Sequence, residues 1–171
     1  DLIGKPPLLT KIISVTHFLG KPAYMMSMVE IARKHGIEIL EDCALAVGAT
    51  HSGRHVGLIG YAGCFSFYPC KHITTGGEGG ILLTSDSGVA EKAKKLSSFG
   101  YGFDRDGGVS EVGGNFRMME MQAAIGIEQL KRFPRFLDRR IQNMKVLKKK
   151  LADFDVIGGT YAMSVFVPDG S

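Results

Sequence analysis

Two short apolar segments flank one amphipathic segment near the start of the chain. Residues 12–16 (IISVT) and 37–41 (IEILE) have the length and the apolar side chains of buried β-strands. Between them, residues 25–35 (MMSMVEIARKH) place apolar side chains at helical spacing, and Gly36 follows where a helix commonly ends. A strand, a helix and a second strand make a βαβ unit, which predicts a parallel sheet with a right-handed crossover.

The middle of the chain is predicted to add two strands and a helix. Residues 46–63 are rich in glycine and predict turns. Strands are expected at 64–67, which runs into a proline, and at 80–84. A helix is expected at 88–99, because a serine and an aspartate stand before it as capping residues and a glycine follows it.

Two helices are predicted in the last third of the chain. Residues 101–114 have no periodicity and many glycines, so they predict a loop. Apolar side chains recur at helical spacing over 116–132, and Pro134 is expected to interrupt this helix. A second long helix is expected over 135–153, followed by the start of a strand in the apolar tail TYAMSVFVP.

Composition excludes several classes of protein. The chain has 171 residues, 44% of them hydrophobic, which suits one ordinary domain and is too apolar for a disordered chain. It contains no run of apolar residues long enough to span a bilayer, and no secretory signal is visible at its start. The odd number of cysteines, three in no metal-ligand spacing, favours a reducing, cytoplasmic compartment.

The positive charge is concentrated in one segment. The formal net charge is +4, but residues 131–150 alone hold nine Lys or Arg residues against the single Asp138. A nucleic-acid-binding helix is therefore one alternative function, since its basic side chains would contact phosphates. The same helix carries four apolar residues on one face: Phe136, Ile141, Met144 and Leu147. This pattern favours a helix that packs through its apolar face and exposes its basic side chains to solvent.

Two groups of residues are candidates for chemistry. Glu41 and Asp42 end a predicted strand, where functional groups gather in open α/β sheets, although a loop-capping aspartate is the plain alternative. Lys71 follows a predicted buried strand beside aromatic residues, so desolvation could keep its amine neutral and nucleophilic, although a solvated loop lysine would look the same. The glycines and hydroxyls after it could bind a phosphate.

Three motifs in this order carry a family resemblance: EDCALAVGAT (41–50), CFSFYPCKHITTGGEGG (64–80) and GGNFRMMEMQAAIGIEQL (113–130). The chain resembles the DegT/DnrJ/EryC1/StrS sugar aminotransferases, which are pyridoxal-phosphate enzymes. The resemblance implies an α/β fold: part of the large domain of a fold-type I enzyme, a mostly parallel sheet with flanking helices. It places the cofactor-binding large domain at 1–132, and a linking helix with the start of a truncated small domain at 133–171.

The resemblance also assigns roles to five residues. Lys71 matches the lysine that binds the cofactor covalently. Asp42 matches the aspartate that pairs with the protonated pyridine nitrogen and so keeps the ring electron-withdrawing. Ala44 matches the small residue against one ring face, and Ser66 the hydroxyl that binds the cofactor phosphate. Asn115 matches an asparagine that reaches the cofactor of the neighbouring subunit. No metal site is expected.

The implied reaction is the amination of a nucleotide-linked keto sugar for amino-sugar biosynthesis, with glutamate or glutamine as the amino donor. The implied assembly is a cytoplasmic homodimer with shared active sites, without a nucleic-acid or membrane partner. One subgroup of the family instead removes a sugar hydroxyl and has histidine in place of the cofactor lysine. The presence of Lys71 favours transamination over that dehydratase alternative.

The chain departs from the family pattern in three respects. Leu45 stands where a glutamine commonly contacts the phenolic oxygen of the cofactor, and the pair Gly76-Gly77 replaces one glycine of the usual loop. The resemblance also covers less than half of a typical member, without the upstream turn that grips the phosphate. An inactive or truncated member that serves as an interaction domain is therefore a further alternative.

Overall fold

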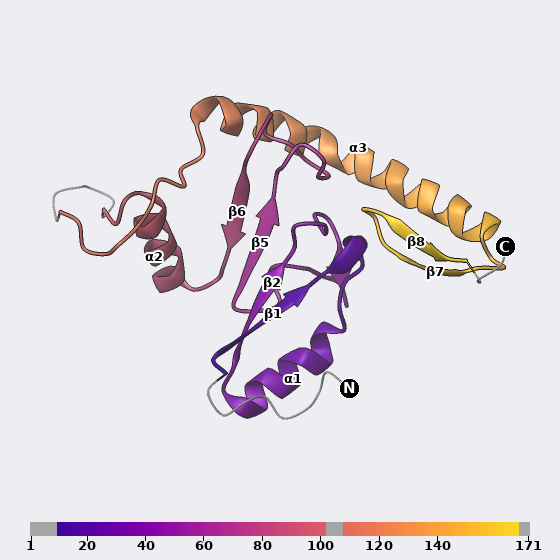
Figure 1. Cartoon of the computed structure of the whole chain (residues 1–171), viewed down its shortest axis with the longest axis horizontal. Coiled ribbons are helices and arrows are strands. Elements are labelled where there is room, and N and C mark those ends of the chain that lie inside the picture. Colours follow the sequence, from indigo (N-terminus) through magenta and orange to yellow (C-terminus); the bar gives the residue numbers. More distant parts are fainter. Residues whose placement is uncertain (1–9, 102–107, 168–171) are drawn as a thin grey trace.

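The computed structural model describes residues 10–101 and 108–167. A four-stranded sheet forms its centre (Figure 1), and its strands are β1 (Ile12–Thr16), β2 (Glu38–Asp42), β5 (Ala62–Ser66) and β6 (Gly80–Leu83). The spatial order is β1-β2-β5-β6. β1 runs parallel to β2 and β2 parallel to β5, whereas β6 pairs antiparallel with β5. The predicted α/β class with a mostly parallel sheet is confirmed.

The crossover helix α1 (Met25–His35) joins β1 to β2, as the periodicity predicts. Its apolar side chains pack on the two strands and form one core cluster, which contains Val15, Met25, Ala32, Ile37 and Ile39. Gly36 ends the helix with φ of 63°, and its N–H donates to the carbonyl of Ala32. This left-handed conformation is the one that glycine adopts at little cost at helix ends.

A second core cluster lies under the loops that follow β2 and β5. It gathers apolar side chains from the strands, loops and the last long helix: Cys43, Ala46, Val47, Ala49, Val56, Phe65, Phe67, Ile73 and Phe133. The glycine-rich stretch between β2 and β5 is mostly turns, as expected, but it includes a small hairpin of β3 (Thr50–His51) and β4 (Arg54–His55).

Helix α2 (Ser87–Ser97) begins at the N-cap Asp86, whose carboxylate accepts the N–H of Val89 at 3.0 Å.

The predicted break at Pro134 is wrong. One continuous helix, α3 (Glu120–Lys150), passes through the proline and runs along the long axis of the molecule (Figure 1). A proline inside a helix removes one backbone hydrogen bond. The helix persists because Phe133 before the proline and Leu137 after it both pack on the second core cluster. Helix α3 also begins at Glu120 rather than at residue 116.

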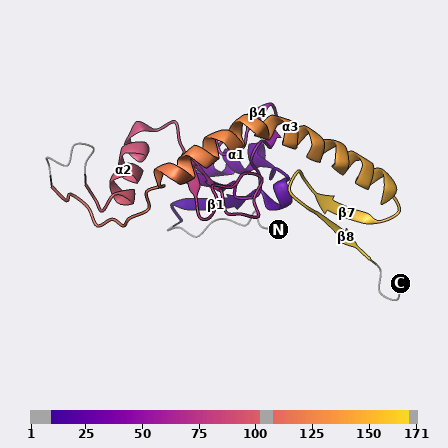
Figure 2. The same cartoon turned by 90° about the horizontal axis from the view of Figure 1, so that it is seen from above.

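After α3 the chain forms a hairpin of β7 (Asp155–Gly158) and β8 (Met163–Phe166), of which only the second strand was expected. The hairpin lies along the C-terminal half of α3 in both views (Figures 1 and 2). Its turn binds the short helix η1 (Phe18–Gly20): the carbonyl of Leu19 accepts the N–H groups of Gly159, Tyr161 and Ala162 at 3.1–3.3 Å. No helix within residues 10–101 and 108–167 combines the length and apolar composition that a membrane span requires.

Candidate active site

Asp42 is the last residue of β2, at the carboxyl end of the parallel strands. Its half-buried carboxylate accepts the N–H of Ala44 at 3.0 Å on Oδ1, and the hydroxyl of Thr16 donates to Oδ2 at 3.4 Å. The two contacts hold the carboxylate and fix the turn that carries Ala44. Each carboxylate oxygen has two lone pairs, so Asp42 keeps capacity for a further donor.

Ser66 ends β5, the strand next to β2. The parallel register pairs Asp42 with Cys64, and the bond from Cys43 N–H to the carbonyl of Cys64 at 2.8 Å continues the ladder. Paired residues point to the same face of a sheet, and so does a residue two positions along the strand. Asp42 and Ser66 therefore lie on the same face of the sheet, at the carboxyl ends of their strands.

Lys71 lies in the loop that follows β5. Its N–H donates to the carbonyl of Tyr68 at 2.9 Å, while the N–H of Tyr68 donates to the hydroxyl of Ser66 at 3.3 Å. A turn thus connects the Ser66 hydroxyl directly to the Lys71 backbone. The amine of the half-buried Lys71 lies 5.7 Å from the centre of the Tyr161 ring.

Asn115 is exposed and lies in the segment between α2 and α3. Its described contacts are a β-bridge to Ser98 and a hydrogen bond in which Arg117 donates to the side-chain oxygen at 2.9 Å. The structure therefore brings four of the five predicted residues to one end of the sheet, whereas the contacts described for Asn115 are to Ser98 and Arg117.

The loop after Lys71, which contains the pair Gly76-Gly77, is held by hydrogen bonds to its own backbone and to α3. Gly76 has φ of 81°, a conformation that favours glycine. The hydroxyl of the buried Thr75 donates to the carbonyl of Glu78 at 3.1 Å, and Gln122 of α3 donates to the same carbonyl at 2.8 Å. Leu45 lies half-buried in the turn after β2, and its aliphatic side chain offers no donor.

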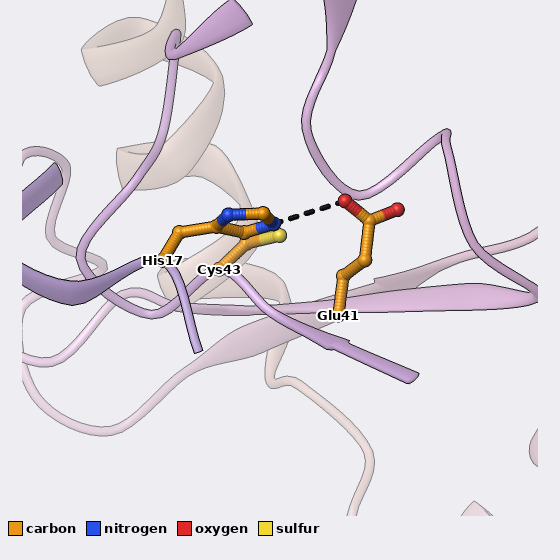
Figure 3. Close-up of side chains that lie close together, drawn as sticks. All are labelled: His17, Glu41 and Cys43. Carbon is orange, nitrogen blue, oxygen red and sulfur yellow. Dashed lines mark hydrogen bonds and ion pairs between the residues drawn. The ribbon is translucent and has the colours of Figure 1, made fainter. Parts of the chain in front are cut away.

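On the opposite face of β2, Glu41 and His17 form a buried pair (Figure 3). His17 Nε2 lies 2.9 Å from Glu41 Oε2, and both side chains are fully buried. His17 Nδ1 accepts the N–H of Ala23 at 3.1 Å, so the ring carries its proton on Nε2 and donates it to Glu41. The pair ties the segment after β1 to the end of β2.

Glu41 also binds the loop that leads to β5. Its carboxylate accepts the N–H of Gly57 at 2.8 Å on Oε2, and those of Ile59 at 2.8 Å and Gly60 at 2.6 Å on Oε1. Burial by itself would raise the pKa of Glu41, but the hydrogen bonds from His17 and from the three backbone groups outweigh it and lower the pKa to about 2. The carboxylate is therefore charged and fully hydrogen-bonded.

Cys43 completes a cluster whose ligand atoms all lie within 4.8 Å of those of His17 and Glu41. The atoms that could bind a metal are already engaged, since both ring nitrogens of His17 and both carboxylate oxygens of Glu41 make hydrogen bonds. Burial, and then the nearby charges of Glu41 and Asp42, raise the pKa of the Cys43 thiol, so it stays protonated. The chemistry of this cluster is that of a structural anchor rather than of a metal centre.

His72, next to Lys71, is buried between the rings of Phe133 at 6.1 Å and Tyr161 at 5.3 Å. Burial, with the positive charges of Arg140 and Lys71, lowers the pKa of His72 to about 4, while the main chain of Thr160 acts in the opposite direction. The ring is therefore neutral at physiological pH and serves as packing under the Lys71 loop.

Comparison with known proteins identifies the family of this chain. Residues 8–163 match the sequence profile of the DegT/DnrJ/EryC1/StrS aminotransferase family. The chain belongs to this family.

Three relatives illustrate the likeness. The GDP-perosamine synthase of Caulobacter vibrioides is 40% identical over 143 residues, which are 84% of this chain and 38% of that protein. The Helicobacter pylori aminotransferase PseC, of pseudaminic acid biosynthesis, has a TM-score of 0.86 at 29% identity, over 94% of this chain and 46% of that one. An E. coli GDP-4-keto-6-deoxy-D-mannose-3-dehydratase with bound hydrated PLP has a TM-score of 0.87 at 28% identity, over 99% of this chain and 50% of that one.

This DegT/DnrJ/EryC1/StrS family member thus spans about two fifths of the length of the curated relatives that it matches. Two of its features were not predicted from the sequence: the pairing of Glu41 with His17, and the position of Tyr161 beside Lys71. The first had a signal. Ile37, Ile39 and Glu41 alternate along the strand, which places Glu41 on the buried face, where a carboxylate requires partners.

Proposed function

We propose that this chain provides the cofactor-binding part of a pyridoxal-phosphate-dependent aminotransferase that aminates a nucleotide-linked keto sugar, with glutamate or glutamine as the amino donor. The single observation that carries the proposal is geometric. Asp42 and Ser66 lie on one face at the carboxyl ends of adjacent parallel strands, and a turn joins Ser66 to Lys71.

The residues present suit pyridoxal phosphate in their chemistry. Asp42 offers a held carboxylate with remaining acceptor capacity for a protonated ring nitrogen. Ser66 accepts the N–H of Tyr68, which leaves its own O–H to donate to a phosphate, and Lys71 offers an amine that is only half-buried. Ala44, fixed by its N–H bond to Asp42, presents a methyl group small enough to lie under a flat ring.

When bound, pyridoxal phosphate supplies an electron-withdrawing ring that stabilises negative charge at the substrate carbon. In this proposal Asp42 keeps the ring nitrogen protonated, because a carboxylate close to it favours the charged form. Ser66 orients the phosphate, and Nζ of Lys71 holds the cofactor covalently. The Glu41 anchor fixes the position of Asp42, because it binds the segments on both sides of β2.

Transamination is favoured over sugar dehydration. A dehydratase is among the structures that this chain resembles closely, so the fold alone does not distinguish the two reactions. The presence of Lys71, instead of the histidine that marks the dehydratase subgroup, supports the aminotransferase reaction. The names of the relatives, which include a GDP-perosamine synthase and a UDP-sugar 3-aminotransferase, support a nucleotide-linked sugar as the substrate.

A homodimer with shared active sites is part of the proposal. Several apolar side chains just before and within the first half of α3 are largely exposed in the single chain: Phe116, Met119, Met121, Ile125, Ile127 and Leu130. An apolar surface of this kind is uncommon on monomers, and a second copy of the chain is the simplest cover. Asn115 stands at its margin, where a two-fold axis could carry it to the cofactor of the partner. Met118, by contrast, packs on the second core cluster.

Covalent labelling tests the function. The full chain is incubated with pyridoxal phosphate, reduced with borohydride and analysed by peptide mass spectrometry. We expect the label on Lys71, and no specific label in Lys71→Ala. Lys131→Ala, at an exposed lysine paired with Glu128, is the matched control and should label normally. Labelling spread evenly over surface lysines, with no preference for Lys71, would refute the assignment.

A further inference from the structure

The turn of the β7–β8 hairpin reaches the loop of Lys71, although the two segments lie far apart in the sequence. Tyr161 donates its hydroxyl to the carbonyl of Cys70 at 3.2 Å, and the hydroxyl also lies 3.7 Å from Cys70 Sγ. The same Tyr161 presents its ring to the Lys71 amine, at 5.7 Å from ring centre to Nζ. One side chain therefore contacts both the backbone before Lys71 and the amine of Lys71.

Tyr161 is itself held from two directions. Arg140, in the C-terminal half of α3, donates to the carbonyls of Thr160 and Tyr161 at 3.4 Å each. On the other side, the carbonyl of Leu19 accepts the N–H of Tyr161 at 3.3 Å and those of its neighbours in the turn. The hydrogen bond to Cys70, and then burial, raise the pKa of the Tyr161 phenol, so it remains a donor at neutral pH.

We propose that Tyr161 is a positioning residue for Lys71: its hydroxyl fixes the loop, and its ring restrains the amine. This inference rests on the proposed function of Lys71 as the cofactor lysine. A lysine side chain has high rotamer entropy, which must be lost before Nζ reaches a single place. The ring face beside Nζ limits the positions that the amine can take, and the hydrogen bond to Cys70 keeps the backbone from moving.

The test measures covalent attachment of pyridoxal phosphate to Lys71 over time, with borohydride quenching and peptide mass spectrometry. The limiting rate reports the placement of Nζ, and the half-saturating concentration reports how well the site binds the cofactor. Tyr161→Phe removes only the hydroxyl, and Tyr161→Leu removes both contacts. Phe166→Leu, on the exposed end of the same hairpin, is the matched control.

We expect the limiting rate to fall about threefold in Tyr161→Phe and about tenfold in Tyr161→Leu, with an unchanged half-saturating concentration. Phe166→Leu should behave as the unaltered chain. A limiting rate in Tyr161→Leu within twofold of the unaltered chain overturns the proposal. So does a rise in the half-saturating concentration that accounts for the whole effect, since that result means a general change of the site.

A second measurement separates this inference from the proposed function. If the unaltered chain attaches no cofactor to Lys71, the function fails, and acetylation by acetic anhydride then decides the role of Tyr161. Acetylation of Lys71 relative to the exposed Lys131 should rise about twofold in Tyr161→Leu, because the ring no longer covers the amine. An unchanged ratio in that variant shows that Tyr161 does not restrain Lys71.

Discussion

Replacing Glu41 by glutamine is expected to destabilise the protein strongly, although the change is nearly isosteric. The carboxylate accepts four hydrogen bonds, two on each oxygen, from His17, Gly57, Ile59 and Gly60. An amide has one oxygen and one NH₂ group, and the NH₂ group cannot accept. In Glu41→Gln two buried donors therefore face another donor.

The magnitude follows by two routes. An unsatisfied buried donor costs about 1–3 kcal/mol, so two of them cost about 2–6 kcal/mol. Independently, the pKa of Glu41 is lowered from 4.5 to about 2, which corresponds to about 3 kcal/mol of stabilisation of the folded state at neutral pH. The second value, about 3 kcal/mol, lies within the range that the first route gives.

Urea unfolding of the full chain, followed by circular dichroism, measures this loss at pH 7. The pH dependence has a definite sign. Because the folded pKa of Glu41 is lowered, its contribution is complete above about pH 4.5 and is lost as the pH falls towards 2. Glutamine does not titrate in this range. The difference in unfolding free energy between the unaltered chain and Glu41→Gln should therefore shrink between pH 6 and pH 3.

Glu38→Gln is the matched control, because Glu38 lies on the same strand with an exposed side chain. Its effect should stay within about 0.5 kcal/mol. The reasoning about the buried carboxylate is wrong if the free energy of unfolding of Glu41→Gln lies within 1 kcal/mol of that of the unaltered chain at pH 7. It is also wrong if the difference between the two free energies is constant from pH 6 to pH 3.

Three further predictions concern the site, the core and the assembly. Asp42→Asn should lower kcat/KM at least about a hundredfold, since the ring nitrogen loses its charged partner, and near-normal turnover would exclude the role. Phe133→Ala should lower the free energy of unfolding by about 3–5 kcal/mol, because the buried ring packs in the second core cluster; urea unfolding with a loss under 1 kcal/mol contradicts this packing. Ile125→Asp, at a side chain 43% exposed in the single chain, should shift sedimentation from dimer to monomer, and an unchanged dimer would place the interface elsewhere.

The regular elements near the candidate site followed from local sequence. The helix at 25–35 and the strand at 12–16 have the bounds that periodicity predicts, because their apolar faces and the glycine at 36 are local signals. The carboxyl ends of β2 and β5 lie at the same end of the sheet, because the two strands are parallel neighbours. The roles of Asp42 and Lys71 came from the family resemblance and remain predictions.

Long-range contacts determined what local sequence could not predict. Pro134 is a local signal for a helix end, but Phe133 and Leu137 pack on a core built by distant strands, and this packing outweighs the lost hydrogen bond. The basic helix was expected to pack through Phe136, Ile141, Met144 and Leu147. The first three side chains are half-buried, whereas Leu147 is exposed, and Phe133, just before the predicted helix, is buried. The place of Tyr161 beside Lys71 depends on a hairpin whose first strand had no clear pattern.

The continuous helix α3 connects the exposed apolar segment at its start to the hairpin turn that contains Tyr161. Ile125, in the exposed apolar half, and Arg140, which holds the turn of Tyr161, are about 22 Å apart along a single helical rod. Because no loop separates these two residues, a rigid-body tilt of the helix at one of them would also move the other. Had Pro134 ended the helix, a hinge would separate the two. A partner that binds the exposed apolar half of α3 would therefore also affect the position of the hairpin turn, and of Tyr161, relative to Lys71.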